Sequence, residues 1–351
     1  MFRPWLNNYV PKKKMEKQRI AWVDVLKYFG IFLIYIGHFG EAAGRTYHFV
    51  WAFHVPLFFF IAGCMESLNR ETSILLNIKR KFVALMIPFY FFSLVSLAVY
   101  TIQNNLSLND LKPHIIALLM GNVRNAFIVF QLWFLSCLFV THVFFELIKL
   151  LKIKFLMIGI SLILFIISEK ILPFRPIVTP KWYYNVDSSL YYTVYFCLGY
   201  VFFHKINNIL SSNGKPEKLA IYSTGGIAFI YTTFYFFDKD YLRSISFVPF
   251  LSVIIPIFRA LIIIWFFIIV SYVCRNINNI SIIGKNSLYL CGNEFIVKII
   301  VPSIVSMFGL QITLTTPVVA FIYTALLLYF VNTFMVPVEY KTISVINKIL
   351  K

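Results

Sequence analysis

The chain has 351 residues, of which 60% are hydrophobic, 19% are aromatic and only 13% are charged. Soluble domains are about 25% charged, so this composition excludes an ordinary soluble enzyme, a disordered protein and a disulfide scaffold. It indicates an all-α, polytopic membrane protein. The apolar runs are continuous rather than alternating, which argues against a membrane β-barrel.

We predict about ten transmembrane helices, each using roughly 20 residues. Their approximate bounds are 20–40, 49–66, 82–102, 126–147, 155–172, 189–204, 219–237, 257–274, 288–308 and 317–337. The predicted domain division is a basic cytoplasmic tail at 1–19, one transmembrane domain at 20–337 and a cytoplasmic tail at 338–351. The apolar, Pro-containing segment 238–256 is expected to be re-entrant or to lie at the membrane interface.

The formal net charge of +18 is explained by membrane topology. With the N-terminus inside, the inner segments hold 21 Lys and Arg residues and the outer segments hold 9. Such an asymmetry predicts that both termini are cytoplasmic, N-in and C-in, in a cell membrane. We therefore expect membrane lipid, and no nucleic acid, as a partner. The oligomeric state is left open.

The cysteines predict neither a disulfide nor a metal site. All five lie in apolar runs or at their edges, and none has a His neighbour at metal-ligand spacing. They are Cys64, Cys137, Cys197, Cys274 and Cys291.

The first predicted span carries the densest set of ionisable residues. Such a residue inside a span costs roughly 2.5–3.5 kcal/mol on insertion scales, so it marks a functional site by default. Asp24 and Lys27 are three residues apart and can pair on one helical face. His38 follows Lys27 after about three turns, roughly 16 Å along the axis, and Glu41 lies three residues further. These residues predict one polar stripe, and snorkelling ends with a hydrogen-bonded core histidine are the alternative.

The second span contains His54 and Pro56 near its outer end. We expect Pro56 to kink this helix and so to open a cavity beside His54, although a kinked packing helix is an alternative. Glu66 is expected to be solvated at the inner end of this span.

Two later pairs have helical spacing of four residues. His142 and Glu146 are expected to pair or to snorkel near the inner end of the fourth span. Glu294 and Lys298 are expected to form a structural ion pair in the ninth span.

The tract "RIAWVDVLKYFGIFLIYIGHFG" resembles the first helix of the acyltransferase-3 family of integral membrane proteins, in which an acidic residue, a basic residue and a His recur. Asp24, Lys27 and His38 occupy these places, and Lys27 resembles the fucose-4-O-acetylase-like branch. Four further tracts resemble later family signatures, namely "FHVPLFFFIAG" (53–63), "RKFVALMIPFYFFS" (80–93), "LWFLSCLF" (132–139) and "IGKNSLYL" (283–290). The chain departs from the family at Asn293 and Glu294, near which many members have a His.

The resemblance implies an enzyme that moves an acetyl group from cytoplasmic acetyl-CoA to a hydroxyl of an extracytoplasmic or lipid-linked surface glycan. His38 is then the candidate general base, because an imidazole with a pKa near 6.5 can accept a proton at neutral pH. Glu41 is the candidate residue that orients His38, and His54 is a rival base.

The same resemblance suggests where acetyl-CoA binds. Lys27, paired with Asp24, would stabilise the thioester oxyanion or hold part of the CoA. The basic set Lys79, Arg80 and Lys81 would hold CoA phosphates, or would only mark the cytoplasmic side. Trp51 and Trp182 would stack on a sugar ring or anchor the membrane interface.

Two other classes use intramembrane polar residues. A transporter or flippase should show paired broken helices in two matching halves, and the sequence shows no such duplication. A glycan polymerase is expected to have a large, charged outer loop, and the longest one here is modest. Many members of that family carry a fused extracytoplasmic hydrolase-like domain; we expect this chain to work without one, alone or with a separate partner.

Overall fold

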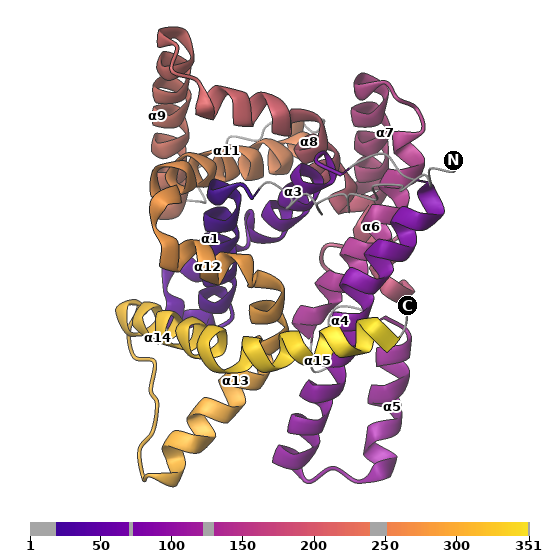
Figure 1. The fold of residues 1–351 in the computed structure, drawn as a ribbon, viewed down its shortest axis with the longest axis vertical. Coiled ribbons are helices and arrows are strands. Elements are labelled where there is room, and N and C mark those ends of the chain that lie inside the picture. Colours follow the sequence, from indigo (N-terminus) through magenta and orange to yellow (C-terminus); the bar gives the residue numbers. More distant parts are fainter. Residues whose placement is uncertain (1–18, 70–72, 122–129, 239–250, 350–351) are drawn as a thin grey trace, which may run out of the picture.

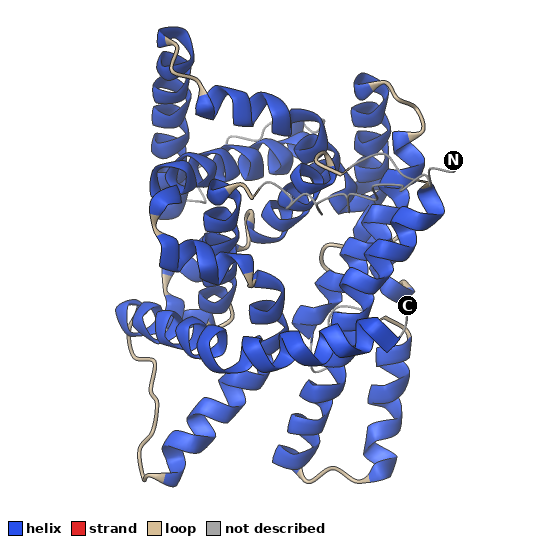
Figure 2. Cartoon of the chain, viewed as in Figure 1, coloured by secondary structure: helices blue, strands red, loops and turns tan. Residues whose placement is uncertain are grey.

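The computed structural model describes residues 19–69, 73–121, 130–238 and 251–349, and Figure 2 shows helices and loops without a strand in this part of the chain. The all-α prediction is therefore confirmed for the described residues. The α-helices are α1 (Ala21–Gly37), α2 (Arg45–Val50), α3 (His54–Glu66), α4 (Ile74–Asn104), α5 (Leu108–Leu119), α6 (Trp133–Lys149), α7 (Lys154–Ile166), α8 (Val186–Ser211), α9 (Lys215–Phe237), α11 (Leu251–Val273), α12 (Asn278–Lys285), α13 (Ser287–Met307), α14 (Pro317–Phe330) and α15 (Val336–Ile349).

Five helical stretches in the described part of the chain are long and apolar enough to cross a membrane. They are Ile74–Asn104, Lys215–Phe237, Val253–Asn276, Ser287–Met307 and Pro317–Lys348. This supports an integral membrane protein with several spans, whereas ten spans and their orientation stay predictions. Most of the basic tail and most of segment 238–256 lie outside the described residues.

The first two predicted spans are shorter and more interrupted in the structure than in the sequence analysis. α1 ends at Gly37, and the predicted span 49–66 is divided into α2 and α3 by a turn. Because α3 begins at His54, Pro56 lies in the first helical turn, where a missing backbone N–H interrupts no helical hydrogen bond. The prediction that Pro56 kinks the helix is therefore wrong.

The predicted outer segment 103–125 contains a helix that the apolar pattern did not reveal. α4 ends at Asn104, and α5 begins after Ser107, whose side chain and that of Asp110 form a capping box. A Ser followed three residues later by an acidic residue signals a helix start. Figure 1 shows α4 and α5 as a helical hairpin that projects from the rest of the bundle.

Glycines allow the central helices to approach closely. A Cβ atom at Gly63 of α3 would collide with the carbonyl of Phe196, and one at Gly199 of α8 would collide with the carbonyl of Phe60. Small residues at such crossings are typical of packed membrane helices. Gly284 of α12 packs in the same way on the carbonyl of Asp24 in α1. The contact of Gly284 with Asp24 joins segments 260 residues apart in the sequence, and it packs α1 against α12.

Candidate active site

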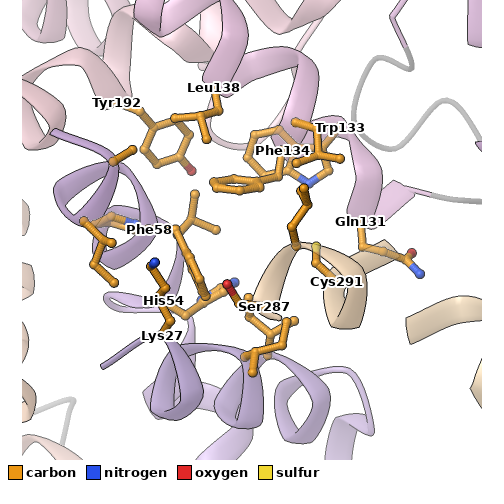
Figure 3. A pocket seen from close by; sticks show the side chains of 18 of the residues that line it. Lys27, His54, Phe58, Gln131, Trp133, Phe134, Leu138, Tyr192, Ser287 and Cys291 are labelled. Carbon is orange, nitrogen blue, oxygen red and sulfur yellow. The ribbon is translucent and has the colours of Figure 1, made fainter. Parts of the chain in front are cut away.

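A cavity of about 710 Å³ lies among α1, α3, α6, α8 and α13 (Figure 3). Its wall includes Lys27 of α1, His38 directly after α1, His54 of α3 and Ser287 at the start of α13. Phe58, Phe134 and Tyr192 form part of the apolar wall. Three polar side chains predicted from the sequence as site residues therefore face one space.

His38 is a candidate base in this cavity whose ring contacts a buried carboxylate. It follows the last residue of α1, and its Nδ1 atom lies 2.6 Å from Oε1 of Glu294 in α13. A carboxylate only accepts hydrogen bonds, so Nδ1–H donates to Glu294 and the lone pair of the neutral ring is on Nε2. The His38 side chain is 17% exposed, whereas that of Glu294 is 1% exposed. The contact fixes one imidazole tautomer at the cavity wall.

Lys298 completes this group, which we call the outer triad of His38, Glu294 and Lys298. Its Nζ atom lies 2.7 Å from Glu294 Oε1 and 3.0 Å from the Tyr35 carbonyl oxygen. It also lies 4.1 Å from the centroid of the Phe39 ring. The predicted ion pair between Glu294 and Lys298 is confirmed, and His38 joins it as a third member.

Glu41 does not have the position that the sequence predicted. Because α1 ends at Gly37, Glu41 lies exposed on a 3-10 turn (Gly40–Ala43) and not on the helical face of His38. The carboxylate that contacts His38 is Glu294, 256 residues away. The sequence drew attention to Glu294 through its departure from the family pattern and its spacing from Lys298, but it did not indicate His38 as a partner.

His54 faces the same cavity as His38. It is 5% exposed, and its Nδ1 atom lies 2.8 Å from the carbonyl oxygen of Val50. Nδ1–H must donate to that carbonyl, so the lone pair of neutral His54 is also on Nε2. The Trp51 ring is near both histidines, with centroid distances of 5.8 Å to His38 and 5.0 Å to His54.

Asp24 contacts two cations rather than one. Lys27 Nζ lies 3.5 Å from Asp24, which confirms the predicted pair, but Arg19 Nε is closer at 2.6 Å. Arg19 also donates to the carbonyl and the hydroxyl of Ser281 in α12. Since Lys27 lines the cavity and Asp24 does not, Asp24 positions Lys27 and ties α1 to α12.

The predicted phosphate-binding set is divided by the structure. Lys79 and Arg80 are exposed, whereas Lys81 Nζ lies 2.6 Å from Glu66 Oε2. Glu66 is 1% exposed, so the prediction that it is solvated is wrong. The first half of α4 lies against the end of α3, so that Asn77 and Lys81 both contact the Glu66 carboxylate.

Glu66 is the centre of a second buried polar group, which we call the inner polar cluster. Its members are Glu66, Asn77, Lys81, His142, Glu146 and Lys149. The polar contacts of His142 and Glu146 are to other members: Nδ1 of His142 lies 3.8 Å from Glu66, and Glu146 accepts a hydrogen bond from Asn77 at 2.5 Å. The expected pair between His142 and Glu146 is replaced by these contacts. None of the cluster members belongs to the cavity wall formed by the described residues.

In the described ranges, no group of three His, Cys, Asp or Glu side chains is placed to hold a metal ion. The five cysteines are free thiols, of which Cys291 lines the cavity.

Comparison with family models gives the class of the protein. Residues 20–336 match the acyltransferase-3 family, whose model describes an acyltransferase domain. The match covers most of the chain, so the chain belongs to the acyltransferase-3 family and is a membrane-bound acyltransferase. A search of curated proteins and a search of solved structures found no match.

Proposed function

We propose that this enzyme is an O-acetyltransferase of the fucose-4-O-acetylase-like branch, in a plasma membrane. It would move an acetyl group from cytoplasmic acetyl-CoA to a hydroxyl of an extracytoplasmic or lipid-linked surface glycan. The observation that carries the proposal is the 2.6 Å contact of His38 with buried Glu294 at the wall of a cavity that also contains Lys27.

The proposed chemistry is direct acyl transfer. Nε2 of His38 takes the proton of the acceptor hydroxyl while the oxygen attacks the thioester carbonyl carbon. The carbon–sulfur bond breaks, and the CoA sulfur leaves with the proton that His38 carried. Glu294 stabilises the imidazolium form of His38 during the step, as the acid of a catalytic triad does.

The distance between Lys27 and His38 decides between the two roles predicted for Lys27, which are oxyanion stabilisation and CoA binding. Lys27 lies near the middle of α1 and His38 directly follows the helix, so the two residues are eleven apart, about 16 Å along the axis. One side chain cannot span that length, so Lys27 is too far away to stabilise the oxyanion that forms beside His38. We assign Lys27 to the CoA arm, with Asp24 positioning its ammonium group.

The phosphate-binding proposal is narrowed to two residues. Lys79 and Arg80 are exposed and available to CoA phosphates, which prefer charge-assisted contacts. Lys81 is engaged by Glu66, so we no longer assign it to CoA.

The proposal is tested with purified protein in liposomes and acetyl-labelled acetyl-CoA. We expect labelled acetyl on a glycan acceptor with the wild-type protein and none above background with His38→Ala. His54→Ala in the same assay tests the rival base. Movement of a glycan precursor without acetyl transfer, by protein shown to be folded, would instead favour the transporter alternative.

A further inference from the structure

One side of the cavity is apolar, and the proposed transfer step does not use it. Five of its residues form what we call the apolar wall, namely Phe134 and Leu138 of α6, Ile177 and Val178 of the segment before α8, and Tyr192 of α8. Figure 3 shows Phe134, Leu138 and Tyr192 across the cavity from Lys27 and Ser287. The Tyr192 hydroxyl is the one polar side-chain group of this wall, so the wall offers a ligand mainly burial of apolar surface.

The apolar wall lies at the same end of the bundle as the cavity histidines. The Tyr192 ring stacks on that of Phe59 in α3 with centroids 4.4 Å apart, and the Phe134 ring meets Phe59 at 5.3 Å. Phe59 lies in the second turn of α3, which begins with His54. Leu138 and Tyr192 likewise lie in the second turn of their helices. The wall is therefore level with the start of α3, where the candidate bases lie.

Asp187 fixes the segment that carries two residues of the apolar wall. Its carboxylate is 0% exposed and accepts hydrogen bonds from the backbone N–H groups of Lys181 at 2.6 Å and Trp182 at 3.1 Å. The hydroxyl of the next residue, Ser188, donates to the Pro176 carbonyl oxygen at 3.4 Å. Both ends of the segment are thus tied to the start of α8. The Trp182 side chain itself is outside the cavity wall that the described residues form.

The proposed position of the donor leaves the apolar wall to the acyl group. CoA lies toward Lys27 and the thioester lies beside His38, so the arm that joins them follows α1. The amides of that arm need polar partners, which the apolar wall does not supply beyond one hydroxyl. The acyl chain begins at the thioester carbonyl and extends away from the CoA arm. It therefore reaches the part of the cavity that the CoA arm does not occupy.

We propose that the apolar wall binds the acyl chain of the donor, and that the enzyme uses short linear acyl-CoA thioesters longer than acetyl-CoA. This inference rests on the acyl-transfer function above and adds a class of donor to it. The step is the same for each chain, since the acceptor oxygen bonds to the acyl carbon, the carbon–sulfur bond breaks and His38 passes the proton to sulfur. Val178 is 57% exposed and marks the cavity mouth, where further methylenes return to water.

The first test measures donor binding and needs no acceptor. Purified protein in liposomes binds tritium-labelled acetyl-CoA, which unlabelled acetyl-, propionyl-, butyryl- and hexanoyl-CoA then displace. Burial of one methylene changes a binding constant about fourfold, so we expect the inhibition constant to fall by up to about fourfold for each added carbon until the chain reaches the mouth. Liposomes without protein give the partitioning of each thioester into lipid, which is subtracted.

Variants of Leu138 test whether the chain binds at the apolar wall. Leu138→Phe fills space at the wall, so the gain with chain length should disappear, while affinity for acetyl-CoA stays within about twofold. Leu138→Ala should move the tightest binding to a longer chain. Leu97 supplies the matched control, because it is 6% exposed against 7% for Leu138 and is absent from the cavity wall of the described residues. Leu97→Ala should keep the wild-type dependence on chain length.

The thermal midpoint of every variant is measured, and either Leu138 variant suffices where the other does not fold. Wild-type protein that binds acetyl-CoA with no dependence on chain length would overturn the acyl site and leave the proposed function standing. A gain with chain length that persists in folded Leu138→Phe would overturn it too, because the chain would then bind away from the apolar wall.

The second test uses labelled butyryl-CoA in the transfer assay described above. We expect label on the glycan acceptor from butyryl-CoA as well as from acetyl-CoA. Label from acetyl-CoA alone would overturn the wider donor range and leave the proposed function intact. Folded wild-type protein that binds none of the thioesters, or that transfers neither label, would overturn the proposed function and this inference together.

Discussion

The outer triad and the inner polar cluster are built from the same residue types but differ in access. Each has a buried glutamate with a lysine ammonium close to it, at 2.7 Å for Lys298 and Glu294 and at 2.6 Å for Lys81 and Glu66. Each also has a histidine beside that glutamate. His38 is 2.6 Å from its partner and lines the cavity, whereas His142 is 3.8 Å from Glu66 and lies away from the cavity.

The difference teaches that intramembrane charge alone does not mark a catalytic group. Glu66 accepts hydrogen bonds from Asn69 and Asn77 besides its contact with Lys81, so its oxygens are engaged by the protein. Such a network holds helix ends together and offers nothing to a substrate. The outer triad instead presents an oriented imidazole to the cavity. Residue type is common to both regions, and solvent or substrate access separates them.

The largest expected effect tests this contrast at the two histidines. His38→Ala should reduce acetyl transfer on the order of 10²-fold or more, because it removes the general base. His142→Ala should lower the amount of folded protein but leave the activity of each folded molecule near the wild-type value. The measurement is transfer rate per folded molecule, with folded protein quantified by size-exclusion chromatography. Equal losses of transfer rate per folded molecule in both variants would show that access to the cavity does not distinguish the two histidines.

The second effect concerns the two glutamates. Glu294→Gln keeps the size of the side chain but removes the charge that stabilises the imidazolium of His38, so we expect kcat to fall about 10-fold to 100-fold with KM for acetyl-CoA nearly unchanged.

Glu66→Gln is the matched variant for Glu294→Gln. It leaves Lys81 partly buried and unpaired, and loss of one partner of a buried pair costs about 3–5 kcal/mol. We therefore expect a lower thermal midpoint and a normal rate per folded molecule. A stable, inactive Glu66→Gln protein would place the inner polar cluster in the chemistry.

These contrasts also show what the sequence could predict. The apolar runs and the motif of Asp24, Lys27 and His38 indicated the helical class, the family and three residues that matter. The helical class follows from the apolar runs and the family from the resemblance of short motifs, and both kinds of signal are visible within single segments. Glu294 was recognised only as the partner of Lys298, because that pair is four residues apart.

Contacts between distant segments were outside the reach of the sequence. The pairing of His38 with Glu294 depends on α1 packing against α12 and α13, and no local pattern records that packing. Glu41 was chosen because the helix was assumed to continue past Gly37. Glu66 was expected in solvent because its partners Lys81 and Asn77 belong to the next helix.

The third prediction asks whether Lys27 is a binding residue or only a partner of Asp24. Lys27→Ala should raise the KM for acetyl-CoA about tenfold, as expected for a lost charged contact, and Lys27→Arg should keep much of the affinity because the charge remains. Arg19 still pairs with Asp24 in the Lys27→Ala protein, so Asp24 is not left without a cation. The double variant Asp24→Ala, Lys27→Ala should stay defective. Recovery of wild-type KM in the double variant would show that Lys27 is purely structural.

The smallest expected effect is on the KM for acetyl-CoA, and it should differ between exposed Lys79 and Arg80 and the less exposed Lys81. Lys79 and Arg80 are exposed, so their contribution to acetyl-CoA binding is screened by salt. Lys79→Ala and Arg80→Ala should each raise the KM for acetyl-CoA only about twofold to fivefold, in line with an exposed ionic contact. The effect should decrease when the ionic strength is raised from low to physiological salt.

Lys81→Met is the matched control for that pair. It removes the same positive charge from the same helix, but it takes away the lysine nearest to the buried Glu66 carboxylate and leaves only Lys149, at 4.0 Å. We expect a loss of thermal stability with a KM for acetyl-CoA near that of the wild type. A salt-dependent rise of KM in Lys81→Met, matching those of Lys79→Ala and Arg80→Ala, would instead show that Lys81 leaves Glu66 to bind the donor. The inner polar cluster would then be part of the CoA site, because its central ion pair would have to open whenever acetyl-CoA binds.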